Sequence, residues 1–357
     1  MFFPQPVLTY TEASREDFQR DTKGLIERLT ARVQKNPDAW EDYFLLGRLF
    51  RIRGETKRAL RLHRNLSVRP FLDRAKKAAL FTEIGLDLLC LRAADYGELY
   101  FLSALDLQKH NVEAMEGLVA ASEYQGNFER AAEVLAKLIK WGRPQASHLA
   151  HVYAALAHKY LEGGLKPRAR RAVQRALKID RDCLYAHVTL ADVYLEANRT
   201  QKAMEVLKRI LFRWPAHSFL VLRRLEDAHY RMNNFPEFET TLREILRTAP
   251  ENYFAHYSLA RHLRKKKRAN PALLALRKSL EINPAYVNSI RDRIEMTGNG
   301  DELPEIRKLA KDFFAIFKRS RRFICPNCRH RYVNVTWRCS QCGFWGTFEI
   351  RYELPAP

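Results

Sequence analysis

Residues 185–215 read YAHVTLADVYLEANRTQKAMEVLKRILFRWP, and this stretch decides the fold of the chain. A doublet of an apolar and a small residue stands at Leu190-Ala191, a turn former follows at Asn198, and Pro215 closes the unit. Apolar residues recur at three- and four-residue spacing on both sides of Asn198, which predicts two helices joined by a tight turn. Because the small residue lets the two helices approach closely, the stretch predicts a packed helical hairpin.

This hairpin pattern recurs along the chain at intervals of 34 to 38 residues. The doublets stand at Leu46-Gly47, Ile84-Gly85, Leu118-Val119, Leu156-Ala157, Leu190-Ala191, Leu225-Glu226 and Leu259-Ala260. The turn formers stand at Gly54, Gly126, Gly164, Asn198 and Asn233. Such residues tolerate the left-handed backbone of a helix C-terminus. The repeat predicts a stacked array in which each hairpin completes its core against its neighbours.

The repeated positions resemble the tetratricopeptide repeat over about residues 38–285. The resemblance implies an all-α fold, a right-handed superhelix of about seven repeats whose concave face is built from the first helices. We expect an N-terminal tail and capping helix in residues 1–37, with the helix near 14–34, and the repeats in 38–285. We expect connecting helices in 286–320, near 287–295 and 302–319, and a small ribbon in 321–357.

The ribbon holds the sharpest chemical signal of the sequence. Two Cys-x-x-Cys pairs, Cys325 with Cys328 and Cys339 with Cys342, are separated by ten residues. Two such knuckles supply the four thiolates of a tetrahedral metal site, so we expect a rubredoxin-like four-cysteine ribbon that binds zinc, with iron as the alternative. Four cysteines saturate the metal, which favours a structural role. We expect the ribbon to dock on the last helices through Phe313, Phe314 and Phe317.

The charge of the chain favours anionic partners. Its 62 basic and 41 acidic residues give a net charge of +21, which suits nucleic acid, anionic lipid or an acidic protein. The first eleven residues contain Pro4 and Pro6 and no basic residue, so they fit neither a signal peptide nor a membrane span. We therefore expect a cytoplasmic protein.

The sequence predicts a non-enzymatic protein. It contains no G-x-x-x-x-G-K-[ST], H-E-x-x-H or G-x-S-x-G string, and we assign no catalytic residue. The isolated Cys90 and Cys183 lie in apolar stretches and are expected to be packing residues.

In tetratricopeptide-repeat proteins, fixed positions of the first helices line a partner-binding groove. In this sequence those positions are Phe44, Arg48, Glu113, Glu116, Glu123, Tyr124, His158, Glu162, Asp192, Glu196, Tyr257 and Arg261. The middle of this set is acidic and both ends are basic. A protein segment with central basic residues would complement it, and the alternative is a set of polar residues that face water.

A basic cluster in the seventh repeat comprises Arg264, Lys265, Lys266, Lys267 and Arg268, and we call it the basic rim. It predicts peripheral contact with anionic membrane headgroups, and the alternative is a solvated surface. Nucleic acid is the rival partner, because Tyr332, Trp337, Phe344 and Trp345 of a basic ribbon would be able to stack on bases.

The two ends of the chain together resemble the bacterial lipopolysaccharide assembly protein B family. The likeness lies in the stretch from Leu46 to Glu55 with Ala59 and His63, and in the ribbon with Trp337 and Trp345. It implies an adaptor at the cytoplasmic face of the inner membrane. Such an adaptor restrains lipopolysaccharide synthesis by promoting destruction of the deacetylase that commits lipid A precursors, through a membrane-bound AAA protease. Members of the family begin with a membrane helix, which we do not find in this sequence.

The expected function is therefore that of a non-enzymatic adaptor with a protein client and a protease as partners. A nucleic-acid-binding scaffold that uses the basic ribbon is the alternative. An electron-transfer protein with iron in the cysteine site is the third possibility.

Overall fold

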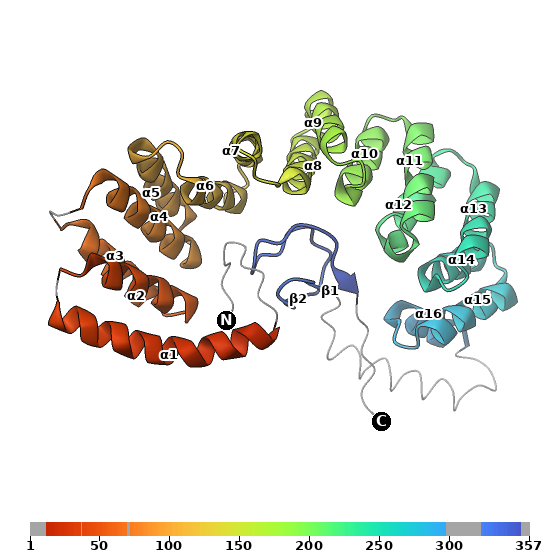
Figure 1. Cartoon of the computed structure of the whole chain (residues 1–357). Coiled ribbons are helices and arrows are strands. Elements are labelled where there is room, and N and C mark those ends of the chain that lie inside the picture. Colours follow the sequence, from red (N-terminus) through yellow and green to blue (C-terminus); the bar gives the residue numbers. More distant parts are fainter. Residues whose placement is uncertain (1–11, 37, 70–71, 298–322, 351–357) are drawn as a thin grey trace. The chain divides into compact units, whose positions relative to one another are not determined.

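The computed structural model describes residues 12–36, 38–69, 72–297 and 323–350. Seven helical hairpins follow one another in these ranges, as the repeat predicts (Figure 1). They are α2 (Trp40–Ile52) with α3 (Thr56–Ser67), α4 (Arg74–Cys90) with α5 (Ala94–Leu107), α6 (Val112–Tyr124) with α7 (Phe128–Lys140), α8 (Ala146–Glu162) with α9 (Lys166–Ile179), α10 (Leu184–Glu196) with α11 (Thr200–Arg213), α12 (Leu222–Arg231) with α13 (Phe235–Thr248), and α14 (Tyr253–Lys265) with α15 (Ala269–Ile282).

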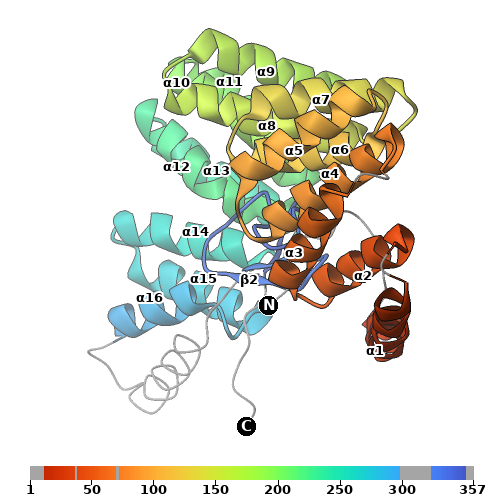
Figure 2. The same cartoon turned by 90° about the vertical axis from the view of Figure 1, so that its left-hand side faces the viewer.

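Helices also flank the repeats. The capping helix expected near residues 14–34 is α1 (Glu12–Lys35), and the helix expected near 287–295 is α16 (Val287–Thr297), which packs on α15 (Figure 2). A short 3-10 helix, η1 (Pro215–Leu220), precedes α12. The helix expected at 302–319, with Phe313, Phe314 and Phe317, lies outside the described residues.

The turn inside each hairpin contains a residue in the left-handed backbone region. The predicted residues all adopt it, with φ between +54° and +83° at Gly54, Gly126, Gly164, Asn198 and Asn233. Arg92 (φ 61°) and Lys267 (φ 58°) occupy the same place in the second and seventh hairpins, where the sequence carries no turn-forming residue type. The geometry of the hairpin therefore requires a left-handed residue in its turn, and in two repeats this requirement overrides the preference of the residue for right-handed backbone.

The small residues of the first helices make room for aromatic rings from the second helices. A Cβ atom added at Gly47 would lie 2.3 Å from Nε2 of His63. One added at Gly85 would lie 2.6 Å from the ring of Phe101, and one at Gly117 only 2.3 Å from the same ring. The predicted close approach is thus the insertion of a buried ring against bare backbone.

The chain forms two compact units, residues 1–152 with 338–345 and residues 153–337 with 346–357. In the first unit, apolar side chains of α1, α2 and α3 share a core that includes Leu29, Leu46 and Phe50. In the second, a larger core runs through successive hairpins from Leu184 to Leu276. No helix in the described part of the chain combines the length and the apolar character that crossing a membrane requires.

The ribbon contains a small antiparallel sheet of β1 (Phe323–Ile324), β2 (Arg331–Tyr332) and β3 (Glu349–Ile350). The strand order is β2-β1-β3, with Phe323 opposite Tyr332 on one side and Ile350 on the other. Such short strands bury little apolar surface, so the segment needs further stabilisation.

Candidate metal centre and binding surfaces

The two cysteine knuckles have the same backbone design. The Cys325 carbonyl accepts from the amide of Arg329, and the Cys339 carbonyl accepts from the amide of Gly343, both at 2.9 Å. Arg329 (φ 58°) and Gly343 (φ 73°) each take the left-handed backbone directly after the second cysteine of the pair. The chain therefore reverses sharply at each knuckle and brings its two thiols to one side.

The four cysteine sulfurs form a site that fits a tetrahedral metal ion. The Sγ atoms of Cys325, Cys328, Cys339 and Cys342 all lie within 4.8 Å of one another, and no disulfide joins them. Zinc–sulfur bonds of about 2.3 Å place tetrahedral sulfurs about 3.8 Å apart, so this cluster is close to the required geometry. A metal bound there would supply folding free energy to the ribbon, and its four protein ligands would leave no position for a substrate.

The remaining cysteines are buried packing residues, as expected. Burial raises the pKa of both Cys90 and Cys183 to about 11, which keeps these thiols protonated at neutral pH.

The second knuckle contacts a predicted groove residue within the first unit. Arg338 Nε donates to Glu123 Oε2 at 2.9 Å, and Trp345 Nε1 donates to Glu123 Oε1 at 3.1 Å. His148 Nε2 lies 2.5 Å from the same Oε1. The Trp345 ring also lies beside the Phe128 ring, with centroids 6.3 Å apart. Glu123 is therefore inaccessible to a partner while this knuckle is in place.

The carboxylate of Glu123 is held charged although its side chain is only 3% exposed. Burial would raise the pKa of Glu123, but the hydrogen bond and charge of His148 and the charge of Arg338 outweigh it and lower that pKa. The contacts of a buried carboxylate with three partners are costly to break, because removal of one partner leaves the negative charge without compensation.

Other ribbon aromatics pack against helices of the second unit. The Trp337 ring stacks on Tyr185, with centroids 4.5 Å apart and planes 12° apart. The Phe323 ring lies 5.9 Å from that of Phe219 in η1. These rings are engaged within the protein, as is Trp345, so they do not form an open platform for bases.

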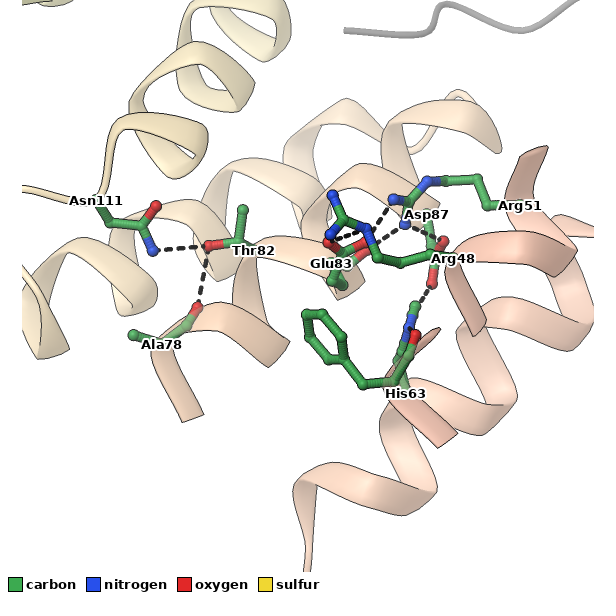
Figure 3. A network of polar contacts seen from close by, with 9 residues as sticks. Arg48, Arg51, His63, Ala78, Thr82, Glu83, Asp87 and Asn111 are labelled. Atoms are coloured by element: carbon green, nitrogen blue, oxygen red, sulfur yellow. Dashed lines mark hydrogen bonds and ion pairs between the residues drawn. The ribbon is translucent and has the colours of Figure 1, made fainter. Parts of the chain in front are cut away.

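A buried ionic network in the first unit joins α2, α3 and α4 (Figure 3). Arg51 pairs with Glu83 and, through Nη1, with Asp87 Oδ1 at 2.9 Å. His63 Nδ1 lies 2.6 Å from Asp87 Oδ2, and Arg48 Nε lies 3.1 Å from Glu83 Oε1. Burial opposes the charge of Arg51, but the two carboxylates outweigh it and raise its pKa. Every charge here has a partner within the protein, so we interpret the network as structural.

The predicted groove residues of the first unit differ widely in accessibility. Glu113 is exposed, and Tyr124 is 48% exposed. Glu116 is half-buried and accepts from Gln145, and burial raises its pKa. Phe44 lies beneath the guanidinium of Arg48, at 5.8 Å, and Arg48 belongs to the ionic network.

The predicted groove residues of the second unit pair largely with one another or with neighbouring helices. His158 lies 3.6 Å from Glu162, and Arg261 lies over the ring of buried Tyr257. Asp192 is held by Arg224 at 2.6 Å, and Glu196 lies 3.9 Å from Lys166. Their role in partner binding remains a prediction.

The basic rim of the seventh repeat is largely neutralised. Lys265 pairs with Glu226 at 2.7 Å, whereas Lys266 and Arg268 share Glu239 at 3.2 and 3.3 Å. A further member, Arg264, contacts acidic residues of α16. Sequence reasoning missed these acceptors because they lie on other helices. Membrane contact through the rim remains a prediction. The ion pairs with these acidic residues reduce the positive charge that the rim would offer to anionic headgroups.

Comparison with known proteins gives a relationship over most of the chain. Residues 161–218 match the model of the tetratricopeptide repeat family. Lipopolysaccharide assembly protein B of Haemophilus influenzae is 24% identical over 311 residues, which cover 86% of this chain and 78% of the relative. The protein of that name in Escherichia coli K12 is 22% identical over 315 residues, which cover 87% and 80%. A solved tetratricopeptide repeat protein from Parabacteroides merdae is 14% identical, with a TM-score of 0.36, over 78% of this chain and 100% of that one.

The match to the repeat family agrees with the helical hairpins of the structure. The match to the two named relatives extends over most of both chains, which is more than one shared repeat would explain. The chain thus carries tetratricopeptide repeats and is similar over most of its length to lipopolysaccharide assembly protein B.

Proposed function

We propose that this protein is an adaptor that regulates lipopolysaccharide synthesis by holding a protein client on its first helices. In the finer form of the proposal, the client is the deacetylase that commits lipid A precursors, and the adaptor delivers it to a membrane-bound AAA protease. The named relatives support the pathway. The repeat supports the mode of action, because stacked hairpins offer a long surface for protein segments.

The observation that carries client binding is the accessible acidic surface of α6. Glu113 is exposed, and Glu116 is a half-buried carboxyl whose pKa burial has raised. A cation brought to Glu116 would stabilise its charged form, which favours a client segment that carries lysine or arginine. Tyr124 at the end of the same helix adds an exposed ring suited to an interface.

The metal ribbon has a supporting role in this proposal. Its second knuckle covers Glu123 at the end of α6, next to exposed Tyr124. The client surface would therefore be bounded by this knuckle, and both parts would be needed for full affinity.

The test is capture of the purified deacetylase by the full chain carrying Glu113→Lys and Glu116→Lys. We expect capture to fall at least about tenfold, because attraction becomes like-charge repulsion. Glu133→Lys on α7 is the matched control, since Glu133 is an exposed glutamate outside the predicted groove. Glu123 is left intact because its reversal would break the ribbon contact.

Equal capture by the double variant and the wild type would remove α6 from the proposal. If the wild type fails to bind the deacetylase and instead retains RNA that nuclease releases, the adaptor proposal is wrong and the nucleic-acid alternative replaces it.

A further inference from the structure

Helix α9 carries the most one-sided charge of the described helices. Its sequence, KPRARRAVQRALKI, contains six basic residues and no acidic one. The side that packs into the array is made of the small residues Ala169, Ala172, Val173 and Ala176. The helix is therefore held by close backbone packing on one side, and its charges are left on the others.

Four of the cations form a straight row. Arg168, Arg171, Arg175 and Lys178 follow one another at three- and four-residue spacing, which places them on one side of the helix over about 15 Å. All four are exposed, and so is Arg170 on the adjoining side. We call these five residues the α9 row.

The α9 row differs from the basic rim in having no acidic partners. Among the described residues, no ion pair or hydrogen bond engages the side chain of any member. Arg175 alone has a ring contact, with its guanidinium 5.9 Å from the centre of Tyr153. In the rim, by contrast, Lys265 and Lys266 each pair with a glutamate of another helix. The positive charges of the basic rim are thus largely neutralised by acidic partners, whereas those of the α9 row remain available to a partner.

Helix stability does not account for the α9 row. Like charges three and four residues apart repel along the whole row. Arg168 also lies in the first turn, where the positive end of the helix dipole disfavours a cation. Solubility would be served equally by mixed charges. The arrangement is therefore unfavourable for the isolated protein and becomes favourable against a negatively charged partner.

We propose that the α9 row docks on the surface of an anionic phospholipid bilayer. Guanidinium groups match phosphate oxygens in a bidentate manner, and a straight exposed row suits a flat array of headgroups. Leu165, directly before α9, is 44% exposed and would reach the boundary between headgroups and acyl chains. Helix α9 has no aromatic residue, so it lacks the stacking platform that single-stranded nucleic acid requires.

This inference stands independently of the client-binding proposal, because α9 is a second helix of its repeat and carries none of the predicted groove residues. The basic rim and the α9 row each contain five cations. Four cations of the rim have an acidic partner, whereas no cation of the α9 row has one among the described residues.

The test compares two variants of the full chain in co-sedimentation with vesicles. The first carries Arg168→Gln, Arg171→Gln and Arg175→Gln, and the matched control carries Lys265→Gln, Lys266→Gln and Arg268→Gln. Vesicles of phosphatidylcholine with phosphatidylglycerol are compared with vesicles of phosphatidylcholine alone. Each surface cation is worth roughly fivefold in binding to anionic lipid, so the α9 variant should lose about 100-fold. The control variant should lose at most about fivefold, because its charges are already paired.

Glutamine retains helix propensity and relieves the repulsion, so circular dichroism should show unchanged helix content in the α9 variant. The proposal is overturned if the wild type does not prefer the anionic vesicles, if the α9 variant binds them like the wild type, or if the rim variant is the one that loses binding. It is likewise overturned if duplex RNA binds at a salt concentration at which the vesicles do not.

Discussion

Arg338 donates a hydrogen bond of 2.9 Å to Glu123, although the two residues are 215 positions apart in the chain. Arg338 directly precedes Cys339 of the candidate metal site, and Glu123 lies near the end of α6. The conformation of the second cysteine knuckle and the accessibility of a predicted client-binding residue are therefore linked by one ion pair. This linkage makes the second knuckle part of the helical surface in the first unit.

Breaking this pair should destabilise the protein. Arg338→Gln would leave the buried Glu123 carboxylate short of its cation, and removal of one partner from a buried pair costs about 3 kcal/mol. Urea denaturation should show the loss, and Glu123→Gln should cost much less in the Arg338→Gln background than in the wild type. Arg329→Gln is the control, because the exposed pair of Arg329 with Glu349 should contribute at most about 1 kcal/mol. Additive effects of the two substitutions would contradict the contact.

Metal removal should unfold the ribbon and leave the helices folded. Native mass spectrometry should find one metal ion per chain, and Cys339→Ser should abolish it. Stripping the metal should then change tryptophan fluorescence, because Trp345 and Trp337 pack through the ribbon, while helix content stays unchanged. Cys183→Ala is the control and should retain the metal. A chain that carries no metal when purified without chelator, or fluorescence that ignores its removal, would be incompatible with this expectation.

Gly117→Ala should be disruptive out of proportion to its size. The added Cβ would lie 2.3 Å from the ring of Phe101, which is fully buried and also lies close to the backbone of Gly85 on another helix. Overpacking of this kind costs about 1–3 kcal/mol. Gly24→Ala in α1 is the control, since nothing lies within 4 Å of its Cβ, and it should be neutral or stabilising by about 0.5–1 kcal/mol. Similar thermal midpoints for the two variants would show that the ring does not pack against bare backbone.

Relief of the left-handed turn at Arg92 should stabilise the second hairpin. A residue with a Cβ atom pays about 1–2 kcal/mol in this region of backbone space, whereas glycine does not. Arg92→Gly should therefore raise the free energy of unfolding by up to about 1 kcal/mol after the entropy of the unfolded chain is counted. Arg53→Gly, at a residue with φ −75°, should lower it instead. The same sign for both changes in chemical denaturation would refute this account of the turn.

Acid should weaken the packing of the seventh repeat through Glu239. Partial burial would raise the pKa of Glu239, but hydrogen bonds from Arg243 and Lys266 outweigh it and lower that pKa to about 2. Because the unfolded chain takes up the proton first, this contribution is fully present above about pH 4.5 and disappears as the pH falls toward 2. Exposure to solvent limits it to about 1 kcal/mol. The stability difference between the wild type and Glu239→Gln should shrink over that interval; a difference that stays constant would contradict the ion pairs.

Much of the architecture could be predicted from local sequence, because its signals repeat within single hairpins. The doublet at Leu190-Ala191 and the turn at Asn198 lie in one stretch and satisfy requirements that hold in any helical hairpin. The clustering of the four cysteines was equally local, since each Cys-x-x-Cys knuckle is set by four consecutive residues. The left-handed turns at Arg92 and Lys267 were not predicted, because arginine and lysine have no preference for this backbone region and the fold imposes it on them.

The sequence by itself determined the repeat, its register, the two Cys-x-x-Cys pairs of the candidate metal site and the excess of positive charge. Only the tertiary structure decided which charges are engaged. Glu123 is covered by Arg338, and Lys265 is neutralised by Glu226, whereas Arg171 on α9 has no partner among the described residues. The physical reason is that an ion pair depends on distance in space, and these partners come from separate elements of the fold whose packing no single stretch of sequence encodes.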